Sequence, residues 1–191
     1  MTQRVIVDSN VLASRVRLDW LFHLQIDNEG MFSLYASNDI YAETVRVLRK
    51  RNPRARGKMI RDRVGKIKAC LGEKVSDLPD DLPFSGTDEG DYHVHAAAIE
   101  GQADILLTFN KSVDFTADPD NEPYEIYHPD DFFQLVIQSN PSCLLPTVRG
   151  QFEYWSLRPK HNGLERALHD AQCPEFAKIV REALSEIAQR M

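Results

Sequence analysis

The chain has 191 residues, and 23 Lys and Arg residues against 29 Asp and Glu residues give it a formal net charge of −6. At about 150 residues per domain, this length predicts one domain with a small appendage. With 42% hydrophobic and 27% charged residues, the composition is typical of a globular protein that buries a substantial core. No apolar stretch approaches the roughly 18 residues that span a bilayer, so we expect no transmembrane helix.

The N-terminus and the cysteines bear on the cellular compartment. Residues 1–4 run directly into Val5-Ile6-Val7, which is too short for the apolar region of a signal peptide, so we expect a cytoplasmic protein. The three cysteines are far apart and form no CxxC pair, which argues against a disulfide framework and against a zinc knuckle. We therefore expect three buried or half-buried thiols.

The net charge hides an uneven distribution. Between Arg46 and Lys68 there are eleven basic residues and one acid, Asp62, so this segment has a net charge of +10 and the remainder has −16. We call residues 46–68 the basic segment. Its cations are Arg46, Arg49, Lys50, Arg51, Arg54, Arg56, Lys58, Arg61, Arg63, Lys66 and Lys68. A basic block on an acidic body can attract an anionic partner that a uniformly acidic protein would repel.

Strands and helices alternate through the first 137 residues. A β-branched run that ends at Asp8 predicts a buried strand, and Ser37-Asn38-Asp39 is a typical helix N-cap region. The predicted elements are, in order, a strand at 4–8, a helix at 12–24, a strand at 32–36, a helix from 37–39 to 52–53, a helix at 58–71, a helix from 87–89 to Gly101, a strand at 103–108, a strand at 125–127 and a helix at 129–137. This alternation predicts an α/β sandwich around a mostly parallel sheet.

After Asn140-Pro141 the pattern becomes purely helical. We expect a helix at 144–157 that is interrupted at Pro146, a short helix at 164–171 and an amphipathic helix at 174–191. About fifty residues of helix cannot bury their apolar faces alone. The sequence therefore predicts a first domain over residues 1–137 and an all-helical C-terminal extension over residues 138–191 that packs on it.

Several carboxylates follow strands or lie near helix starts. Asp8 and Asn110 fall beyond the carboxyl ends of two strands, where parallel sheets bind ligands. Glu43 and Asp91 lie in the first turns of helices, a position that also suits an acid with no other function. Asp8 is harder to explain in this way, because a charge after three β-branched residues is costly unless it is paired. Acids that converge on one point repel each other and normally need a divalent cation.

Four motifs resemble those of PIN domains in order and spacing over residues 1–137. They are Val7-Asp8-Ser9-Asn10-Val11-Leu12, the helical run Tyr41 to Leu48 around Glu43, the run Asp91 to Ala98 with its three alanines, and Leu106 to Phe115 with Thr108, Asn110 and Asp114. The resemblance implies a PIN-like α/β/α sandwich and a metal-dependent ribonuclease. Many bacterial PIN domains are toxins of VapBC toxin–antitoxin pairs, and residues 157–177 resemble the helical extension of some VapC-like toxins.

The resemblance also implies the chemistry of the site. Asp8 and Asp91 would bind Mg²⁺ or Mn²⁺ directly, and Glu43 would hold a second ion or orient a metal-bound water. Asn110 departs from the family pattern, since many members have Asp two residues after the Thr. Asp114 can supply the missing carboxylate, so the sequence leaves open which of the two residues serves the metal. The expected products of RNA hydrolysis have 5′-phosphate and 3′-hydroxyl ends.

Other residues are candidates for substrate binding. Ser9 and Thr108 can hydrogen-bond the carboxylates or the scissile phosphate, and Asn10 can do the same or satisfy the backbone after the strand. Lysines and arginines next to Glu43 can neutralise RNA phosphates, namely Arg46, Arg49, Lys50 and Arg51. The same basic segment can instead receive an acidic segment of a small cognate antitoxin protein, or be a solvated helix face. RNA, the antitoxin and a second copy of the chain in a homodimer are thus the expected partners.

Two alternatives to an active nuclease stay open. In the first, the chain is a PIN-like RNA-binding or scaffold protein whose site has decayed through Asn110. In the second, Asp8 is a phosphatase or receiver-like nucleophile, although position 10 is Asn where a phosphatase of this kind has Asp. His93 and His95 cannot chelate one metal, because residues two apart on a helix point about 200° away from each other. We expect both to be structural, with the alternative that one of them approaches the site.

Overall fold

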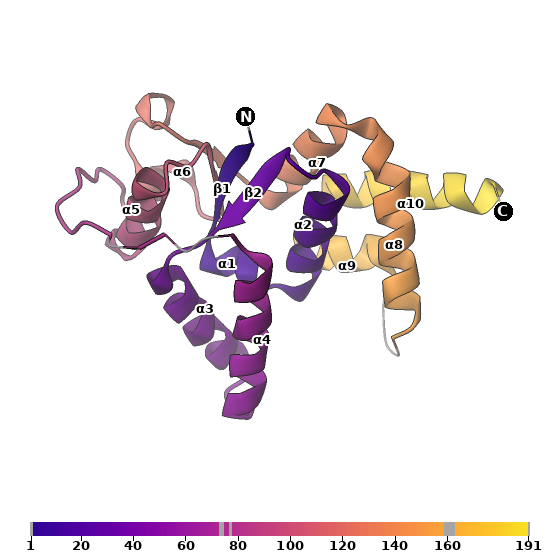
Figure 1. Cartoon of the computed structure of the whole chain (residues 1–191), viewed down its shortest axis with the longest axis horizontal. Coiled ribbons are helices and arrows are strands. Elements are labelled where there is room, and N and C mark those ends of the chain that lie inside the picture. Colours follow the sequence, from indigo (N-terminus) through magenta and orange to yellow (C-terminus); the bar gives the residue numbers. More distant parts are fainter. Residues whose placement is uncertain (1, 73–74, 77, 159–162, 191) are drawn as a thin grey trace. The chain divides into compact units, whose positions relative to one another are not determined.

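The computed structural model describes residues 2–72, 75–76, 78–158 and 163–190. The chain folds into two compact units, each built from two segments of the sequence. Unit 1 comprises Met1–Ala13 and Gly30–His128, and unit 2 comprises Ser14–Glu29 and Pro129–Met191. Figure 1 shows the elements coloured along the chain. The expected boundary between residues 137 and 138 is a different division, and it stays a prediction.

A four-stranded sheet forms the centre of unit 1. Its strands are β1 (Gln3–Val7), β2 (Phe32–Tyr35), β3 (Ile105–Leu107) and β4 (Glu125–Tyr127), all parallel and in the order β2-β1-β3-β4. Val5, Ile6 and Val7 are completely buried, as a central parallel strand requires when both of its faces are covered. The predicted α/β fold with a parallel sheet, flanked by helices and followed by C-terminal helices, is confirmed.

The register of the sheet places two polar residues side by side. Val7 pairs with Leu107, and the amide of Asp8 donates a hydrogen bond of 3.0 Å to the carbonyl of Leu107. On the other side of β3, the amide of Thr108 donates a hydrogen bond of 3.0 Å to the carbonyl of Tyr127 at the end of β4. Asp8 and Thr108 therefore follow neighbouring strands at the carboxyl edge of the sheet, where ligands bind in parallel sheets.

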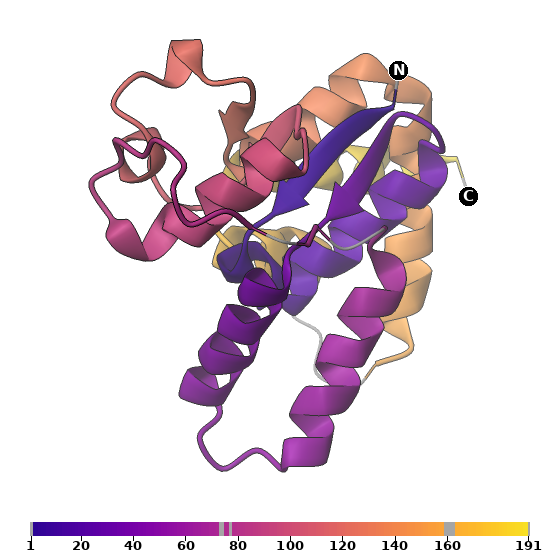
Figure 2. The same cartoon turned by 60° about the vertical axis from the view of Figure 1, so that its left-hand side comes forward.

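The helices of unit 1 include those predicted from 37–39 to 52–53, at 58–71 and from 87–89 to Gly101, and a short one, last in the order below, that was not predicted. They are α1 (Ser9–Leu12), α3 (Asn38–Arg51), α4 (Gly57–Cys70), α5 (Tyr92–Glu100) and α6 (Ser112–Phe115), with 3₁₀ turns η1 (Glu89–Asp91) and η2 (Pro119–Asn121). Ser37 caps α3 as expected, because its hydroxyl accepts a hydrogen bond of 3.2 Å from the amide of Ile40. Figure 2 shows α3 and α4 as an antiparallel pair that contains the basic segment.

Two arginines of the basic segment hold this helix pair against α1. Arg51 and Arg63 both donate to the carbonyl of Ala13, at 3.0 Å and 2.9 Å. Beneath them, Ala13 packs in an apolar cluster with Leu48 and Ile60. Part of the positive charge that the sequence concentrates here therefore satisfies a carbonyl at the end of α1.

One predicted helix is divided in the structure. The sequence suggested a single helix over residues 12–24, but α1 ends at Leu12 and α2 runs from Arg15 to Asp27. Ser14 has an extended backbone, and its hydroxyl accepts from the amide of Arg17 at 3.4 Å. An N-cap serine thus starts a new helix, which belongs to unit 2.

Unit 2 is entirely helical in its described part. Besides α2 it contains α7 (Pro129–Ser139), η3 (Pro141–Cys143), α8 (Leu144–Ser156), α9 (Leu164–Asp170) and α10 (Pro174–Gln189). Pro146 does not interrupt α8, because it lies in the first turn, where amides have no partner within the helix. Phe176 lies at the centre of the core, with ring centroids 5.1 Å from Trp20 and 5.2 Å from Phe133.

Three smaller expectations can be compared with the structure. Cys143 and Cys173 are buried as expected, whereas Cys70 is exposed. Within the described ranges, no helix combines the length and apolar character needed to cross a bilayer. Residues 159–162 of the stretch that resembles a toxin extension, and Met191 of the last predicted helix, lie outside the described residues.

A buried carboxylate caps the last helix of unit 2. Asp130, on α7, is 6% exposed, and its two oxygens accept from the amides of Phe176 at 2.8 Å and Glu175 at 3.0 Å. These amides belong to the first turn of α10 and have no acceptor within that helix. The negative charge also lies at the positive end of the helix dipole. Asp130 thus stabilises α10 by both hydrogen bonding and electrostatics.

We expect Asp130→Ala to lower the free energy of unfolding by about 2–3 kcal/mol, because the buried amide of Phe176 and the partly buried amide of Glu175 lose a charged acceptor. Asp131→Ala, at the exposed neighbouring position, is the matched control and should change it by less than about 0.5 kcal/mol. Urea unfolding followed by circular dichroism measures both. Equal effects of the two substitutions would show that the cap contributes nothing.

Candidate active site

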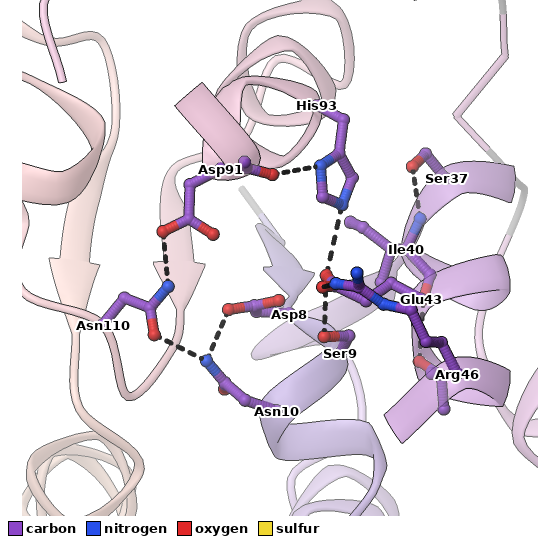
Figure 3. A network of polar contacts seen from close by, with 12 residues as sticks. Asp8, Ser9, Asn10, Ser37, Ile40, Glu43, Arg46, Asp91, His93 and Asn110 are labelled. Carbon is purple, nitrogen blue, oxygen red and sulfur yellow. Dashed lines mark hydrogen bonds and ion pairs between the residues drawn. The ribbon is translucent and has the colours of Figure 1, made fainter. Parts of the chain in front are cut away.

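Asp8 is the centre of a polar network at the carboxyl edge of the sheet (Figure 3). Its side chain is 2% exposed, and Oδ2 accepts hydrogen bonds of 2.6 Å from both the Thr108 hydroxyl and the Asn10 amide. Burial raises the pKa of Asp8 above its ordinary value, and the nearby charge of Glu43 adds to this, while the Thr108 hydrogen bond opposes it. Asp8 is thus a buried carboxylate whose ionised form is disfavoured.

Two asparagine amides connect Asp8 with Asp91 (Figure 3). Asn10 Nδ2 donates to Asp8 and also lies 3.2 Å from Asn110 Oδ1, which accepts from it. Asn110 Nδ2 in turn donates to Asp91 Oδ2 at 2.5 Å. The structure thereby brings together four residues that the sequence nominated, from three separate segments of the chain.

Asp91 reaches the network from the start of α5. It ends the 3₁₀ turn η1, which Asp88 caps by accepting a hydrogen bond of 2.9 Å from the amide of Gly90. Burial raises the pKa of Asp91 to about 6, although the hydrogen bond from Asn110 lowers it. The negative charges of Asp8, Asp88 and Glu43 raise it further. Asp91 and Asp8 are therefore close enough to disfavour each other's ionised forms.

Glu43 enters from α3 and has its own partners. Its oxygens accept from the Ser9 hydroxyl at 2.9 Å and from Arg46 Nη2 at 2.6 Å. His93 Nε2 lies 3.4 Å from the same carboxylate, and His93 Nδ1 lies 2.9 Å from the carbonyl of Gly90. Glu43 thus forms an ion pair with a guanidinium and lies beside an imidazole, whereas no cationic side chain in the described part of the chain forms an ion pair with Asp8 or Asp91.

His93 is the site residue that the sequence analysis underrated. Helical periodicity separated it from His95 correctly, and His95 is structural, with Nδ1 2.7 Å from the hydroxyl of Tyr124. Periodicity could not decide which of the two histidines faces Glu43. Asp91 and His93 are also two positions apart, so helical periodicity gave no signal that both side chains reach the same network.

Asp114 does not join this network. Its carboxylate accepts from the amide of Lys111 at 2.9 Å and from the Thr87 hydroxyl at 3.3 Å, which caps the short helix α6. Asn110, by contrast, hydrogen-bonds both Asn10 and Asp91. The geometry therefore associates Asn110 with the carboxylates, and the metal role of Asp114 stays a prediction.

The four basic candidates on α3 have different environments. Arg46 pairs with Glu43, Arg49 donates to the carbonyl of Ala55 at 2.5 Å, and Arg51 binds the end of α1. Lys50 is exposed and lies seven residues after Glu43, which places it on the same face of the helix. Arg46 and Lys50 are thus the two cations of α3 that lie on the Glu43 face.

The donor set suits a hard divalent cation. Within the described residues, no group of three His, Cys, Asp or Glu side chains is arranged to hold one metal ion. The network nevertheless offers two carboxylates with raised pKa values and the amide oxygen of Asn110, which are oxygen ligands of the kind that Mg²⁺ and Mn²⁺ prefer. A cation beside Asp8 and Asp91 would relieve their mutual repulsion, so the residues present fit the metal.

Comparison with known proteins supports this assignment. A family model described as PIN domain matches residues 4–112, which is more than half of the chain. The chain belongs to the PIN domain family. This is a family of metal-dependent nucleases, and the match includes Asp8, Glu43, Asp91 and Asn110 but ends before Asp114. Neither a curated protein nor a solved structure matches the chain.

The raised pKa of Asp91 has a consequence for stability. Between its ordinary value of 3.8 and about 6, the folded protein binds more protons at Asp91 than the unfolded chain. The free energy of unfolding must therefore fall as the pH rises through this interval, and the loss is complete above about pH 6. Asp91→Asn removes the charge and keeps the shape of the side chain.

We expect metal-free Asp91→Asn to be more stable than the unmodified protein by about 1–3 kcal/mol at pH 7.5 and equally stable at pH 3.5. Urea unfolding in EDTA at both pH values measures this difference. Added Mg²⁺ should raise the midpoint temperature of the unmodified protein at pH 7.5 and have little effect on Asp91→Asn. The exposed Asp120→Asn is the control, and a destabilised Asp91→Asn at pH 7.5 would contradict the electrostatic account.

Proposed function

We propose that this PIN domain protein is a Mg²⁺- or Mn²⁺-dependent endoribonuclease and the toxin of a toxin–antitoxin pair. The observation that supports the nuclease best is the pair Asp8 and Asp91, two buried carboxylates with raised pKa values at the carboxyl edge of a parallel sheet. Family membership supports the same chemistry. RNA as substrate, the toxin role, the antitoxin, a homodimer and a cytoplasmic location are parts of this proposal.

The residues of the network have separate roles in this mechanism. Asp8 and Asp91 hold the ion, and Thr108 and Asn110 fix the orientation of these carboxylates through hydrogen bonds of 2.6 Å and 2.5 Å. When bound, the ion makes a water more acidic and stabilises charge on the leaving oxygen. Glu43 orients the attacking water, and its position is fixed by Ser9 and Arg46.

The direction of bond cleavage follows from the proposed products. Water attacks the scissile phosphorus and the bond to the 3′ oxygen breaks, which leaves 5′-phosphate and 3′-hydroxyl ends. Arg46 is exposed beyond its ion pair with Glu43 and can contact a non-bridging phosphate oxygen. Lys50, on the same face of α3, can contact the next phosphate along the RNA.

A PIN-like scaffold without activity is the second candidate, because Asn110 stands where many family members have an acid. The amide of Asn110 donates to Asp91, whereas an aspartate there would repel it. Activity measurements on the unmodified protein separate the two candidates directly. If the unmodified protein cleaves RNA only when metal is added, the hypothesis of an inactive scaffold protein is excluded.

We expect Asp8→Ala and Asp91→Ala each to reduce Mg²⁺-dependent cleavage of total cellular RNA by at least about 100-fold, because each removes a charged group from the reacting centre. Asp120→Ala, at an exposed position of η2, should cleave at the rate of the unmodified protein. Gel analysis with end-group labelling gives rates and product ends. Cleavage by Asp8→Ala at the unmodified rate would refute the assignment.

The toxin role has its own measurement. Induced expression of the unmodified protein should arrest bacterial growth, and expression of Asp8→Ala should not. Co-expression of the small protein encoded next to it should restore growth. RNA cleavage without growth arrest would support the nuclease activity and refute the toxin role.

RNA binding should depend on Lys50 in a salt-sensitive way. In EDTA, where cleavage is prevented, we expect Lys50→Ala to reduce the slope of log affinity against log salt by about 0.7 for a single-stranded RNA, because one phosphate contact is lost. Lys178→Ala, which removes a lysine from unit 2, is the charge-matched control. Fluorescence anisotropy at several salt concentrations measures the slopes, and identical slopes would exclude a phosphate contact.

A further inference from the structure

Aromatic and arginine side chains gather at the C-terminal end of α8 in unit 2. Tyr154 and Trp155 lie in the last turn of this helix, Arg158 follows it, and Arg15 comes from the first turn of α2. Figure 1 shows α2 beside α8. We call these four residues the aromatic–arginine cluster. All four belong to unit 2, whereas the residues of the candidate active site belong to unit 1.

Both arginines of the cluster pack on the aromatic rings. The Cζ atom of Arg158 is 3.3 Å from the ring centroid of Tyr154 and 5.7 Å from that of Trp155. The Cζ atom of Arg15 is 4.9 Å from the ring centroid of Trp155. The two rings contact each other edge to face, with their centroids 5.6 Å apart. Ring packing thus holds both guanidinium groups in a defined orientation before any ligand binds.

The contacts within the cluster use few of the hydrogen-bond donors that it contains. Each guanidinium has five N–H groups. Arg158 Nη1 donates to the carbonyl of Tyr154, and Arg15 Nη2 donates to the hydroxyl of Tyr154 at 3.3 Å. Among the described carboxylates, Asp19 forms the cluster's ion pair, at 3.7 Å from Arg15 Nε, and the Arg15 side chain is 52% exposed. The cluster therefore presents oriented cationic donors at the surface, which is what an anionic ligand requires.

The combination of flat groups and cationic donors favours a nucleic acid over other anions. An acidic peptide would use the donors but leave the planes of the rings and guanidinium groups uncovered. A membrane would need one apolar face, but the exposed Phe152 and Leu157 are five residues apart, about 140° around the axis of α8. Single-stranded RNA supplies both chemistries, because its bases stack on aromatic rings and on guanidinium planes while its phosphates accept hydrogen bonds.

We propose that the aromatic–arginine cluster is a second RNA-binding site, which holds a single-stranded segment outside the candidate active site. Bases stack on the ring and guanidinium planes, and the remaining N–H groups of Arg15 and Arg158 donate to the adjacent phosphates. Because every base has a flat face, the site anchors RNA without selecting a sequence. The choice of RNA among nucleic acids rests on the proposed nuclease function, whereas the binding itself needs neither metal nor cleavage.

Tryptophan fluorescence gives a local readout of this site. The chain has two tryptophans, and Trp20 is 1% exposed in the core of unit 2, so a base can contact only Trp155. Titration of the full chain with octa-adenylate in EDTA should quench the fluorescence saturably, and Trp155→Phe should abolish the quenching. An abasic oligonucleotide of the same length has the phosphates without the bases. It should displace octa-adenylate with at least about fivefold weaker affinity.

Arg158→Lys separates the plane of the guanidinium from its charge. Lysine keeps the positive charge but has no flat group on which a base can stack. We expect this variant to bind octa-adenylate about fivefold more weakly, with an unchanged slope of log affinity against log salt. Arg181→Lys is the matched control, because Arg181 is an exposed arginine of unit 2 that pairs with Glu165, and its effect should be less than about twofold. Circular dichroism verifies that both variants are folded.

Three results would overturn the proposal. The first is that octa-adenylate causes no saturable quenching, or that the quenching persists in Trp155→Phe. The second is that the abasic oligonucleotide competes as well as octa-adenylate, or that Arg158→Lys and Arg181→Lys have equal effects, since the site would then recognise charge alone. The third is that vesicles of phosphatidylglycerol displace octa-adenylate and bind Arg158→Lys more weakly, which would make the cluster a lipid surface. Since every measurement is made in EDTA, none of these results bears on RNA cleavage.

Discussion

The pairing of β1 with β3 is the constraint on which the candidate site depends. The amide of Asp8 continues the ladder by donating to the carbonyl of Leu107, and the same register places the Thr108 hydroxyl 2.6 Å from the Asp8 carboxylate. Asp8 is held in a buried position that its charge disfavours, so the packing of the apolar strands must stabilise this arrangement. A shift of one residue would turn every side chain of β1 to the opposite face and separate the two groups.

The charges of the site are divided into two sets by their partners. Glu43 forms an ion pair with Arg46 and lies beside the imidazole of His93. Asp8 and Asp91 have neutral partners instead, the hydroxyl of Thr108 and the amides of two asparagines. An aspartate at position 110 would add a third uncompensated charge, whereas the amide of Asn110 bridges Asp91 and Asn10. The network thus retains two uncompensated carboxylates, which is the charge that one divalent cation balances.

Strand ends and helix starts indicated which polar residues the fold brings together. Asp8 and Asn110 follow predicted strands, and Asp91 begins a predicted helix, so the parallel order of the sheet brings them together. The role of His93 could not be predicted in this way, because periodicity fixes the relative directions of side chains on one helix but not which direction faces a second helix. The division at Ser14 was missed for a related reason, since the apolar spacing of residues 12–24 continues across the cap.

The basic segment shows why a count of charges underdetermines function. Arg51 and Arg63 satisfy the carbonyl of Ala13 and hold the helix pair to α1, whereas Arg46 lies on the face of Glu43. Arg61 lies elsewhere on the helix pair, where it lines a groove between α3 and α4 with Val45 and Ile60. The same count of charges thus includes cations that hold the fold together, at Arg51 and Arg63, and a cation that pairs with a residue of the site, at Arg46.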